Sequence, residues 1–575
     1  MRCASCFSFF KTFVARFLGS VIYQKGAVII SLVFVLGVLG VLGEELYQVV
    51  KDLCGFGYRR AGTQPAKDAE KYIYEKLKEA GLPEVRLEPF TFTRWWAERH
   101  ELKVLSSGTS RVPSDQQVSS FPVWFSGSTG PDGIDAEVVY VGYGTPADFE
   151  AVDVEGKIVL IDSRMILNFH PTFAVFGSLS LAKSKGALGA IIIGGAPLDA
   201  IPYIFLWEGV EGWRDRLPAL MVNNDDGNYL KSLCSKKLTV RLVEDVRTED
   251  ASSNMVIGEL PGMSEEAILV GTHTDSTFTG AVDNAGANAG LIGLAKHYAK
   301  TPRGKRGKTM VFAGWTGHEA AFLGANKFAQ MHKDILEKTA VFIMLDGFGS
   351  KGYYNQADGG VVETGTDEKR GLFISDNLVL IPPVIEAALK YRLLPAAYVS
   401  ARALPVSDLG PFIRAGIPSI MIIGKPVWYH TVYDTIDKLT PDQLERSLKA
   451  HIHVIDELHR IPASKIKEAD GKLKDIKEFV TRKPGAAPPS GHFTVTPNPV
   501  PEGCPAIFHI TVFTAPESVV LEVEWDFGDG ATSTSLIGVH AYQKPGTYRA
   551  TLKVTDSNGN TVTAKRTVRV TRKNR

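Results

Sequence analysis

Four short apolar runs in the middle of the chain predict buried strands. They cover residues 267–271, 310–315, 341–345 and 419–424, and each is almost continuously apolar. A strand with one face in water alternates apolar and polar positions, whereas a strand covered on both faces has a continuous apolar run. We therefore expect these runs to be central strands of an α/β domain.

Polar side chains follow these runs or lie in the loops beside them. Seven histidine and carboxylate residues do so: His273, Asp275, Asp283, His318, Glu319, Asp346 and His430. Ligands of open α/β sheets bind outside the carboxyl ends of the strands, so side chains far apart in sequence can meet there. Any one of them alone would more often be a loop cap or a solvated charge. Together they favour a metal site, because two imidazoles and three carboxylates from such a set would suit a pair of zinc ions.

The spacing of five of these residues resembles that of the co-catalytic zinc exopeptidases, the family of zinc aminopeptidases and glutamate carboxypeptidases. Successive intervals of 10, 36, 27 and 84 positions separate His273, Asp283, Glu319, Asp346 and His430. The opening at residues 60–70 and the closing histidine motif at residues 428–437 resemble the same family. The resemblance covers about residues 46–460 and implies a mixed central sheet with helices on both faces.

The resemblance also implies a role for each ligand. Asp283 would bridge two zinc ions. His273 and Asp346 would complete the ligands of one ion. Glu319 and His430 would complete those of the other.

Four further residues take roles from the resemblance. Asp275, two residues beyond His273, would orient that imidazole, as metal-bound histidines usually require. Ser407, Asp408 and Tyr429 would lie on the substrate side.

His318 departs from the family pattern. In the family, a glutamate precedes the ligand glutamate and takes the proton of the attacking water, and here that position is His318. Histidine can accept a proton near neutral pH, but two nearby cations would weaken it as a base. The replacement is compatible with a slow hydrolase, with no hydrolysis, or with His318 acting as a metal ligand.

Three functions therefore remain open. The first is a zinc-dependent metalloexopeptidase, most readily an aminopeptidase, acting on a peptide substrate. The second is a binding or adhesion protein on a catalytically weakened peptidase fold, which the replacement at His318 favours. The third is an acyltransferase of the glutaminyl cyclase type, which the insertion described next disfavours.

Two further units are predicted around the exopeptidase domain, which we place at residues 46–120 and 246–462. Residues 121–245 resemble a protease-associated insertion. Its Tyr203, Trp207 and Trp213 could face substrate, but we expect them to serve packing. A helical stretch and proline-rich linker follow at residues 463–490. Short alternating strands over residues 491–575, with the motif Trp525-Asp-Phe-Gly-Asp-Gly, resemble a polycystic-kidney-disease (PKD) type β-sandwich, whose partner would be a cell surface or another protein.

The N-terminus predicts a membrane segment. Residues 1–25 contain four basic and no acidic residues, and residues 26–43 are uncharged and apolar apart from Ser31. This pattern favours a single-pass signal-anchor within residues 1–45, with the N-terminus cytoplasmic and the catalytic domain outside. The alternative is a cleaved signal peptide and a secreted protein.

Charge and cysteine content narrow the picture further. The chain has 64 basic and 63 acidic residues, so nothing in its charge suggests nucleic acid as a partner. Its five cysteines are widely scattered, so they predict no disulfide framework.

Overall fold

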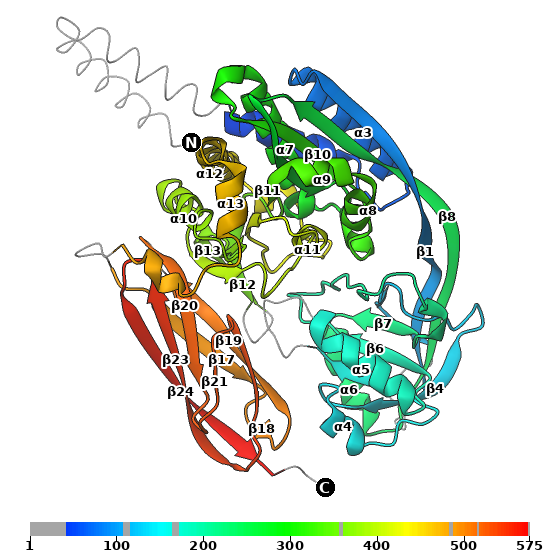
Figure 1. Cartoon of the computed structure of the whole chain (residues 1–575). Helices are drawn as coiled ribbons and strands as arrows, with labels where there is room; N and C mark the ends of the chain where they lie inside the picture. The colour runs from blue at the N-terminus through cyan, green and yellow to red at the C-terminus, as the bar shows by residue number, and fades with distance from the viewer. Residues whose placement is uncertain are drawn as a thin grey trace, which may run out of the picture.

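The computed structural model describes residues 42–106, 115–163, 172–355, 360–481, 487–514 and 517–572. Figure 1 shows a large α/β unit from which two smaller β-rich units extend, the insertion in cyan and the C-terminal unit in orange and red. The α/β class, the inserted unit and the C-terminal β-rich unit predicted from the sequence are confirmed.

The α/β unit contains a mixed sheet of eight strands. In spatial order these are β1 (Glu84–Ser106), β8 (Thr239–Leu260), β10 (Lys308–Trp315), β9 (Ser264–His273), β11 (Thr339–Met344), β16 (Ser419–Ile423), β14 (Arg370–Ile374) and β15 (Ala396–Ser400). The four apolar runs lie in β10, β9, β11 and β16, which are neighbours and mutually parallel. A hairpin of β12 (Lys351–Asn355) and β13 (Val361–Asp367) lies outside this sheet.

Helices cover both faces of the sheet, as the continuous apolar runs require. Along β11, Val341 and Ile343 join one core cluster, whereas Phe342 and Met344 join another. The first cluster packs under a helix over residues 42–55, α3 (Gln64–Glu79), α7 (Gly286–Lys300), α10 (Ile381–Lys390), α12 (Pro441–Arg460) and α13 (Ala463–Ala469). The second packs under α8 (Leu323–Met331), α9 (Lys333–Lys338) and α11 (Leu409–Arg414).

A long two-stranded ribbon carries the inserted unit. β1 and β8 have 23 and 22 residues and pair antiparallel along their lengths, so they extend beyond the α/β unit as Figure 1 shows. The insertion is built on this extension. Its strands and helices are β2 (Gln116–Val118), β3 (Phe121–Pro122), β4 (Ile134–Tyr140), α4 (Pro146–Glu150), β5 (Ile158–Asp162), α5 (Thr172–Ser184), β6 (Gly189–Ile193), β7 (Ala219–Val222) and α6 (Asn224–Cys234).

The C-terminal unit is a β-sandwich. One sheet contains β17 (Ser490–Thr496), β19 (Pro505–Thr514) and β22 (Ile537–Ala541); the other contains β18 (Val500–Pro501), β20 (Val519–Asp526), β21 (Thr532–Ser533), β23 (Gly546–Asp556) and β24 (Thr561–Thr571). β20 also pairs with β15, the edge strand of the central sheet, through residues 519–520 and 396–397. The sandwich is therefore attached at the opposite edge of the sheet from the ribbon.

The predicted membrane location requires a correction. No helix within the described part of the chain is long and apolar enough to cross a membrane. The apolar segment at residues 26–43 lies outside the described residues except for its last two positions.

Candidate active site

The five residues predicted as metal ligands lie at the carboxyl ends of the parallel strands. His273 is the last residue of β9, and Asp346 follows β11 by two positions. Glu319 lies in the short turn η4 (His318–Ala320) after β10, and His430 lies in the loop after β16. Asp283 lies in the turn η2 (Ala281–Ala285) before α7. All five side chains are buried.

These side chains form two adjoining groups that share Asp283. His273 Nε2 lies 3.3 Å from Asp283 Oδ1 and 3.8 Å from Asp346 Oδ1. His430 Nε2 lies 3.2 Å from Asp283 Oδ2 and 3.1 Å from Glu319 Oε2. Each oxygen of the Asp283 carboxylate therefore faces a different histidine. We call the first group the His273 half and the second the His430 half.

The donor atoms fit bound metal ions. Zinc takes nitrogen and oxygen ligands at about 2.0 to 2.2 Å in a tetrahedron, which places neighbouring ligand atoms roughly 3.3 Å apart. Several buried donor atoms form no hydrogen bond with described residues: His273 Nε2, Asp283 Oδ2, Asp346 Oδ1 and both carboxylate oxygens of Glu319. Buried polar atoms normally have partners, so these atoms are placed as ligands would be.

The electrostatics of the site favour cations. Burial disfavours the charged form of His430, but Glu319 and Asp283 outweigh it and raise the pKa of the imidazole to about 9. Burial likewise disfavours the charged form of His273, yet Asp275, Asp283 and Asp346 raise its pKa well above the usual value. The surrounding carboxylates thus stabilise the protonated, positively charged form of both imidazoles. The same negative charge would stabilise a bound cation.

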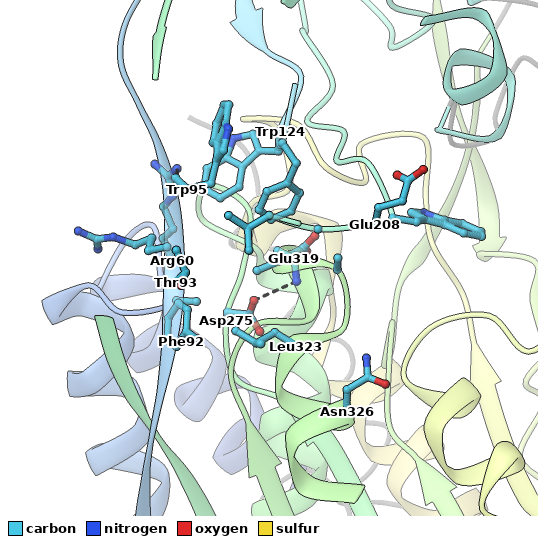
Figure 2. A pocket seen from close by; sticks show the side chains of 18 of the residues that line it. Arg60, Phe92, Thr93, Trp95, Trp124, Glu208, Asp275, Glu319, Leu323 and Asn326 are labelled. Atoms are coloured by element: carbon cyan, nitrogen blue, oxygen red, sulfur yellow. Dashed lines mark hydrogen bonds between the residues drawn. The ribbon is translucent and has the colours of Figure 1, made fainter. Parts of the chain in front are cut away.

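Asp275 connects the His273 half to the turn that carries Glu319. The carbonyl oxygen of Asp275 lies 3.1 Å from His273 Nδ1, and one carboxylate oxygen lies 3.5 Å from the same atom. Its carboxylate also accepts hydrogen bonds from the backbone N–H of His318 at 3.2 Å and of Glu319 at 3.0 Å. Figure 2 shows the bond to Glu319 below Trp124 and Trp95.

Asp434 holds the turn that carries Asp283. Its carboxylate accepts hydrogen bonds from the backbone N–H of Val282 at 2.9 Å and of Asp283 at 3.0 Å. Burial raises the pKa of Asp434 to about 7. Gly280 begins the turn with a φ of 54°, and a Cβ there would lie 2.3 Å from the Asp283 carbonyl oxygen, so only glycine fits.

His318 is packed between the His273 half and a buried carboxylate. Its ring stacks on His273 with centroids 4.0 Å apart and an angle of 12°. Its Nδ1 lies 3.2 Å from Asp408 Oδ2, which also accepts a hydrogen bond from Trp315 Nε1 at 2.8 Å. Asp408 is fully buried beside His318, and substrate contact by Asp408 stays a prediction.

The other two residues predicted on the substrate side contact Asp346 and His430, two of the predicted ligands. Ser407 Oγ donates a hydrogen bond to Asp346 Oδ2 at 2.8 Å. The Tyr429 ring stacks on His430 with centroids 3.6 Å apart. Substrate contact by these residues stays a prediction.

Lys425 is a site residue that the sequence analysis missed. Its Nζ lies 3.3 Å from Asp283 Oδ1 and 3.4 Å from Asp346 Oδ1, and it sits 3.9 Å from the centroid of the Tyr429 ring. Burial disfavours the ammonium charge, but Asp283 and Asp346 raise the pKa of Lys425 well above its usual value. The lysine follows an apolar run, as the ligands do, so the same rule could have found it.

Tyr203 is a second missed residue, and it comes from the insertion. Its hydroxyl donates a hydrogen bond to the carbonyl oxygen of Glu319 at 2.5 Å. Its backbone N–H donates to the carbonyl oxygen of His430 at 2.7 Å, and its own carbonyl oxygen lies 3.0 Å from His430 Nδ1. Tyr203 therefore orients the His430 imidazole from outside the α/β unit, and it does more than the packing we predicted.

A cavity of about 380 Å³ opens beside the metal-binding residues. Asp275 and Glu319 of the α/β unit line it, together with Trp124, Trp207 and Glu208 of the insertion. Figure 2 shows Glu319 and Asp275 below Trp124, with Glu208 to the right. The cavity therefore lies between the α/β unit and the insertion.

Three parts of the chain match models of known families. Peptidase family M28 matches residues 255–455, which contain all five predicted ligands. Residues 255–455 therefore carry a peptidase family M28 domain. The PA domain matches residues 134–230, and the PKD domain matches residues 486–571.

Relatives with known names agree with this family. The chain is 25% identical over 388 residues to carboxypeptidase Q of Xenopus laevis, covering 65% of this chain and 76% of that protein. It is 24% identical over 408 residues to carboxypeptidase Q of Homo sapiens, covering 68% and 79%. An aminopeptidase of Pseudomonas aeruginosa is 25% identical over 330 residues, covering 52% and 55%.

Solved structures show the same fold. A zinc aminopeptidase from Bacillus subtilis superposes with a TM-score of 0.57 at 20% identity, covering 75% of this chain and 98% of that one. An aminopeptidase from Aneurinibacillus sp. strain AM-1 gives 0.51 at 23% identity, covering 75% and 95%. The M28 domain is thus that of a zinc-dependent peptidase, and the residues above are the groups that could hold zinc.

Proposed function

We propose that the M28 domain is a two-zinc exopeptidase that hydrolyses peptides from a free end, most readily the amino end. The observation that carries this proposal is the shared Asp283, whose two oxygens lie 3.3 Å from His273 Nε2 and 3.2 Å from His430 Nε2. A carboxylate in this position can hold two ions about 3.5 to 4 Å apart. Bound zinc would supply Lewis acidity at the scissile carbonyl and lower the pKa of the attacking water.

His318 is the group we propose as general base. One of its ring nitrogens lies within 4.8 Å of ligand atoms of His273 and Asp346, which is close enough for a shared water. Asp408 beside Nδ1 and the stacked His273 ring restrict the imidazole to one orientation. A base held in this way can accept a proton in a fixed geometry, and a carboxylate beside it stabilises the imidazolium that forms.

The cavity supports attack at a chain end. Its volume of about 380 Å³ is within the range of sites for small molecules. The insertion closes one side of it through Trp124 and Trp207. A terminal residue and its neighbour fit such a space better than the middle of a polypeptide.

An assay of the purified protein with zinc added tests this function. The substrates are aminoacyl amides and dipeptides, and the variants are His318→Ala and His318→Glu. We expect the wild type to cleave, a chelator to abolish cleavage, and His318→Ala to lose roughly 10²- to 10⁴-fold in kcat, the usual contribution of a general base. His318→Glu should retain more activity than His318→Ala, because a carboxylate can also accept the proton.

Two results would contradict the proposal. In the first, the wild type binds zinc but cleaves no substrate, and only His318→Glu cleaves. The chain would then be a binding protein on a peptidase fold, the hypothesis that the replacement at His318 favours. If a glutaminyl peptide releases pyroglutamate while no peptide bond is cleaved, the chain is an acyltransferase of the glutaminyl cyclase type.

A further inference from the structure

Two neighbouring arginines have opposite environments near the active site. Arg59 is fully buried, and its guanidinium donates only to backbone carbonyl oxygens. These belong to Leu53, Gly57, Thr274, Thr279 and Gly280. Its donors are therefore used in joining the helix over residues 42–55 to the loops around the metal-binding residues. Arg59 is a structural residue.

Arg60 uses few of its donors. Its guanidinium lies between two indole rings, 3.7 Å from the centroid of Trp96 and 3.5 Å from that of Trp124. One long hydrogen bond of 3.5 Å runs from Nη2 to the carbonyl oxygen of Trp95, and Nε has no partner. No carboxylate among the described residues forms an ion pair with Arg60. Arg60 is half-buried, and its guanidinium has five N–H donors, of which the described residues accept one hydrogen bond.

The free donors of Arg60 belong to the cavity beside the ligands. Arg60 lines that cavity together with Asp275 and Glu319. Tyr58 lines the same cavity. Burial lowers the pKa of Arg60 to about 10, so the guanidinium remains charged at neutral pH.

We infer that Arg60 binds a carboxylate of the substrate next to the scissile bond. The inference rests on the proposed peptidase function and adds a substrate class, namely short peptides that present a carboxylate within the cavity. A planar guanidinium matches a carboxylate with two parallel hydrogen bonds. The flanking indoles already fix its plane, so little conformational freedom is lost on binding.

Two substrate groups supply this chemistry, and paired substrates distinguish them. Leucylglycine against leucylglycinamide tests a free C-terminal carboxylate. Leucylaspartyl amide against leucylasparaginyl amide tests an acidic side chain. We expect the wild type to prefer the carboxylate member of one pair by roughly 10- to 100-fold in kcat/KM, the range of a hydrogen bond to a charged group.

Substitution of Arg60 should remove this preference. In Arg60→Met the ratio of kcat/KM values within the preferred pair should fall to about 1, because the charge is lost. Arg60→Lys should keep an intermediate ratio of kcat/KM values, because an ammonium retains the charge but lacks the two parallel N–H donors of a guanidinium. The matched control is Arg99→Met, which removes an exposed arginine of β1 outside the cavity lining and should keep the wild-type ratio.

Several outcomes would overturn the inference. A wild-type ratio near 1 in both pairs would do so without any variant, and so would an unchanged ratio in folded Arg60→Met. If no substrate is cleaved, the proposed function fails, and the uncleaved dipeptide then becomes a binding probe. Calorimetry with zinc-loaded protein should still show leucylglycine binding more tightly than its amide to the wild type but not to Arg60→Met; equal binding to the wild type would refute the role of Arg60.

Discussion

The insertion and the C-terminal sandwich are attached to opposite edges of one sheet, and they differ in whether they contact the predicted metal site. The insertion extends from β1 and β8 and sends Tyr203 to the carbonyl oxygens of Glu319 and His430. The sandwich pairs with β15 through two residues of β20, and none of its described residues lines the cavity. The two units touch where Thr145 Oγ1 lies 3.8 Å from Cys504 Sγ.

The insertion contacts the predicted metal site, whereas the C-terminal sandwich extends the hydrophobic core of the M28 domain. Val519 and Leu521 of the sandwich belong to the core cluster of the M28 domain, and Ala397 of β15 belongs to the core of the sandwich. The insertion instead contacts the His430 half of the metal site, through Tyr203. We therefore expect changes at the insertion contacts to alter zinc binding and turnover, and changes at the sandwich contacts to alter stability alone.

Glu70 anchors the ribbon where it leaves the central sheet. Its carboxylate accepts hydrogen bonds from Ser253 Oγ, Asn254 N and Asn254 Nδ2 at 2.8 to 3.0 Å, beside the part of β8 that pairs with β10. Burial raises its pKa to about 7. The Glu70 carboxyl therefore keeps its proton to a higher pH in the folded state than in the unfolded state. Its contribution to the free energy of unfolding is present at pH 4 and is lost as the pH rises to about 7.

The expected loss is about 3 kcal/mol of unfolding free energy between pH 4 and pH 8. Glu70→Gln cannot titrate, so this part of the pH dependence should vanish. The variant should also be less stable at every pH, because the NH₂ of the glutamine faces a donor of Ser253 or Asn254. Urea unfolding of both proteins across this range measures the difference. Glu79→Gln, an exposed change on the same helix, is the control. An equal pH slope in wild type and Glu70→Gln would show that the ribbon anchor does not titrate.

Lys425 should make the two halves of the metal site unequal. Its ammonium lies between Asp283 and Asp346, where it competes with an ion in the His273 half, whereas the His430 half is held by Tyr203. If the lysine leaves this position for about 1 to 10% of the time, zinc binds that half roughly 10- to 100-fold more weakly. Lys425→Met should remove this penalty.

Zinc content measured in chelator-buffered solutions tests this expectation without any assay of activity. The wild type should bind one ion tightly and the second weakly, and Lys425→Met should bind both tightly. Lys438→Met removes a cation from the same segment without contact to the ligands and should match the wild type. Two equal ions in the wild type would show that Lys425 does not compete.

Tyr203→Phe tests whether the insertion tunes the His430 half. The change removes the hydrogen bond from the Tyr203 hydroxyl to the carbonyl oxygen of Glu319 and leaves the ring in place. Outer partners of metal ligands are typically worth 10- to 100-fold in affinity or activity, and because the backbone contacts to His430 remain we expect about 10-fold. Tyr229→Phe removes a hydroxyl bonded to Gln116 within the insertion and should change nothing. Equal kinetics in both variants would mean that the insertion only covers the site.

The sequence was most informative where burial leaves a continuous pattern. The runs in β9, β10, β11 and β16 are apolar on both faces, and the polar residues after them could be grouped because parallel strands end at one edge of the sheet. The family spacing then predicted which five side chains meet. The apolar runs are local signals of the chain, whereas the choice of the five side chains depended on the family resemblance.

The remaining features depend on contacts between distant segments. The ribbon of β1 and β8 is held by strand pairing, and its exposed middle carries polar residues such as Glu98, so it has no continuous apolar run. Tyr203 meets His430 across 227 positions, and no periodicity marks such a contact. The environment of Arg60 is likewise set by Trp124 of the insertion, which sequence alone could not place beside it.

The smallest effect is expected where the sandwich meets the linker. Lys477 Nζ of the turn η6 (Ile476–Phe479) lies 3.0 Å from Glu522 Oε2 of β20, a partly exposed pair. Such pairs contribute at most about 1 kcal/mol, because water screens them and two long side chains must be ordered. Lys477→Met should therefore lower the unfolding free energy by no more than this and leave kcat/KM and zinc content unchanged. A loss of activity in this variant would mean that the sandwich, like the insertion, acts on the metal site, and the contrast between the two units would not hold.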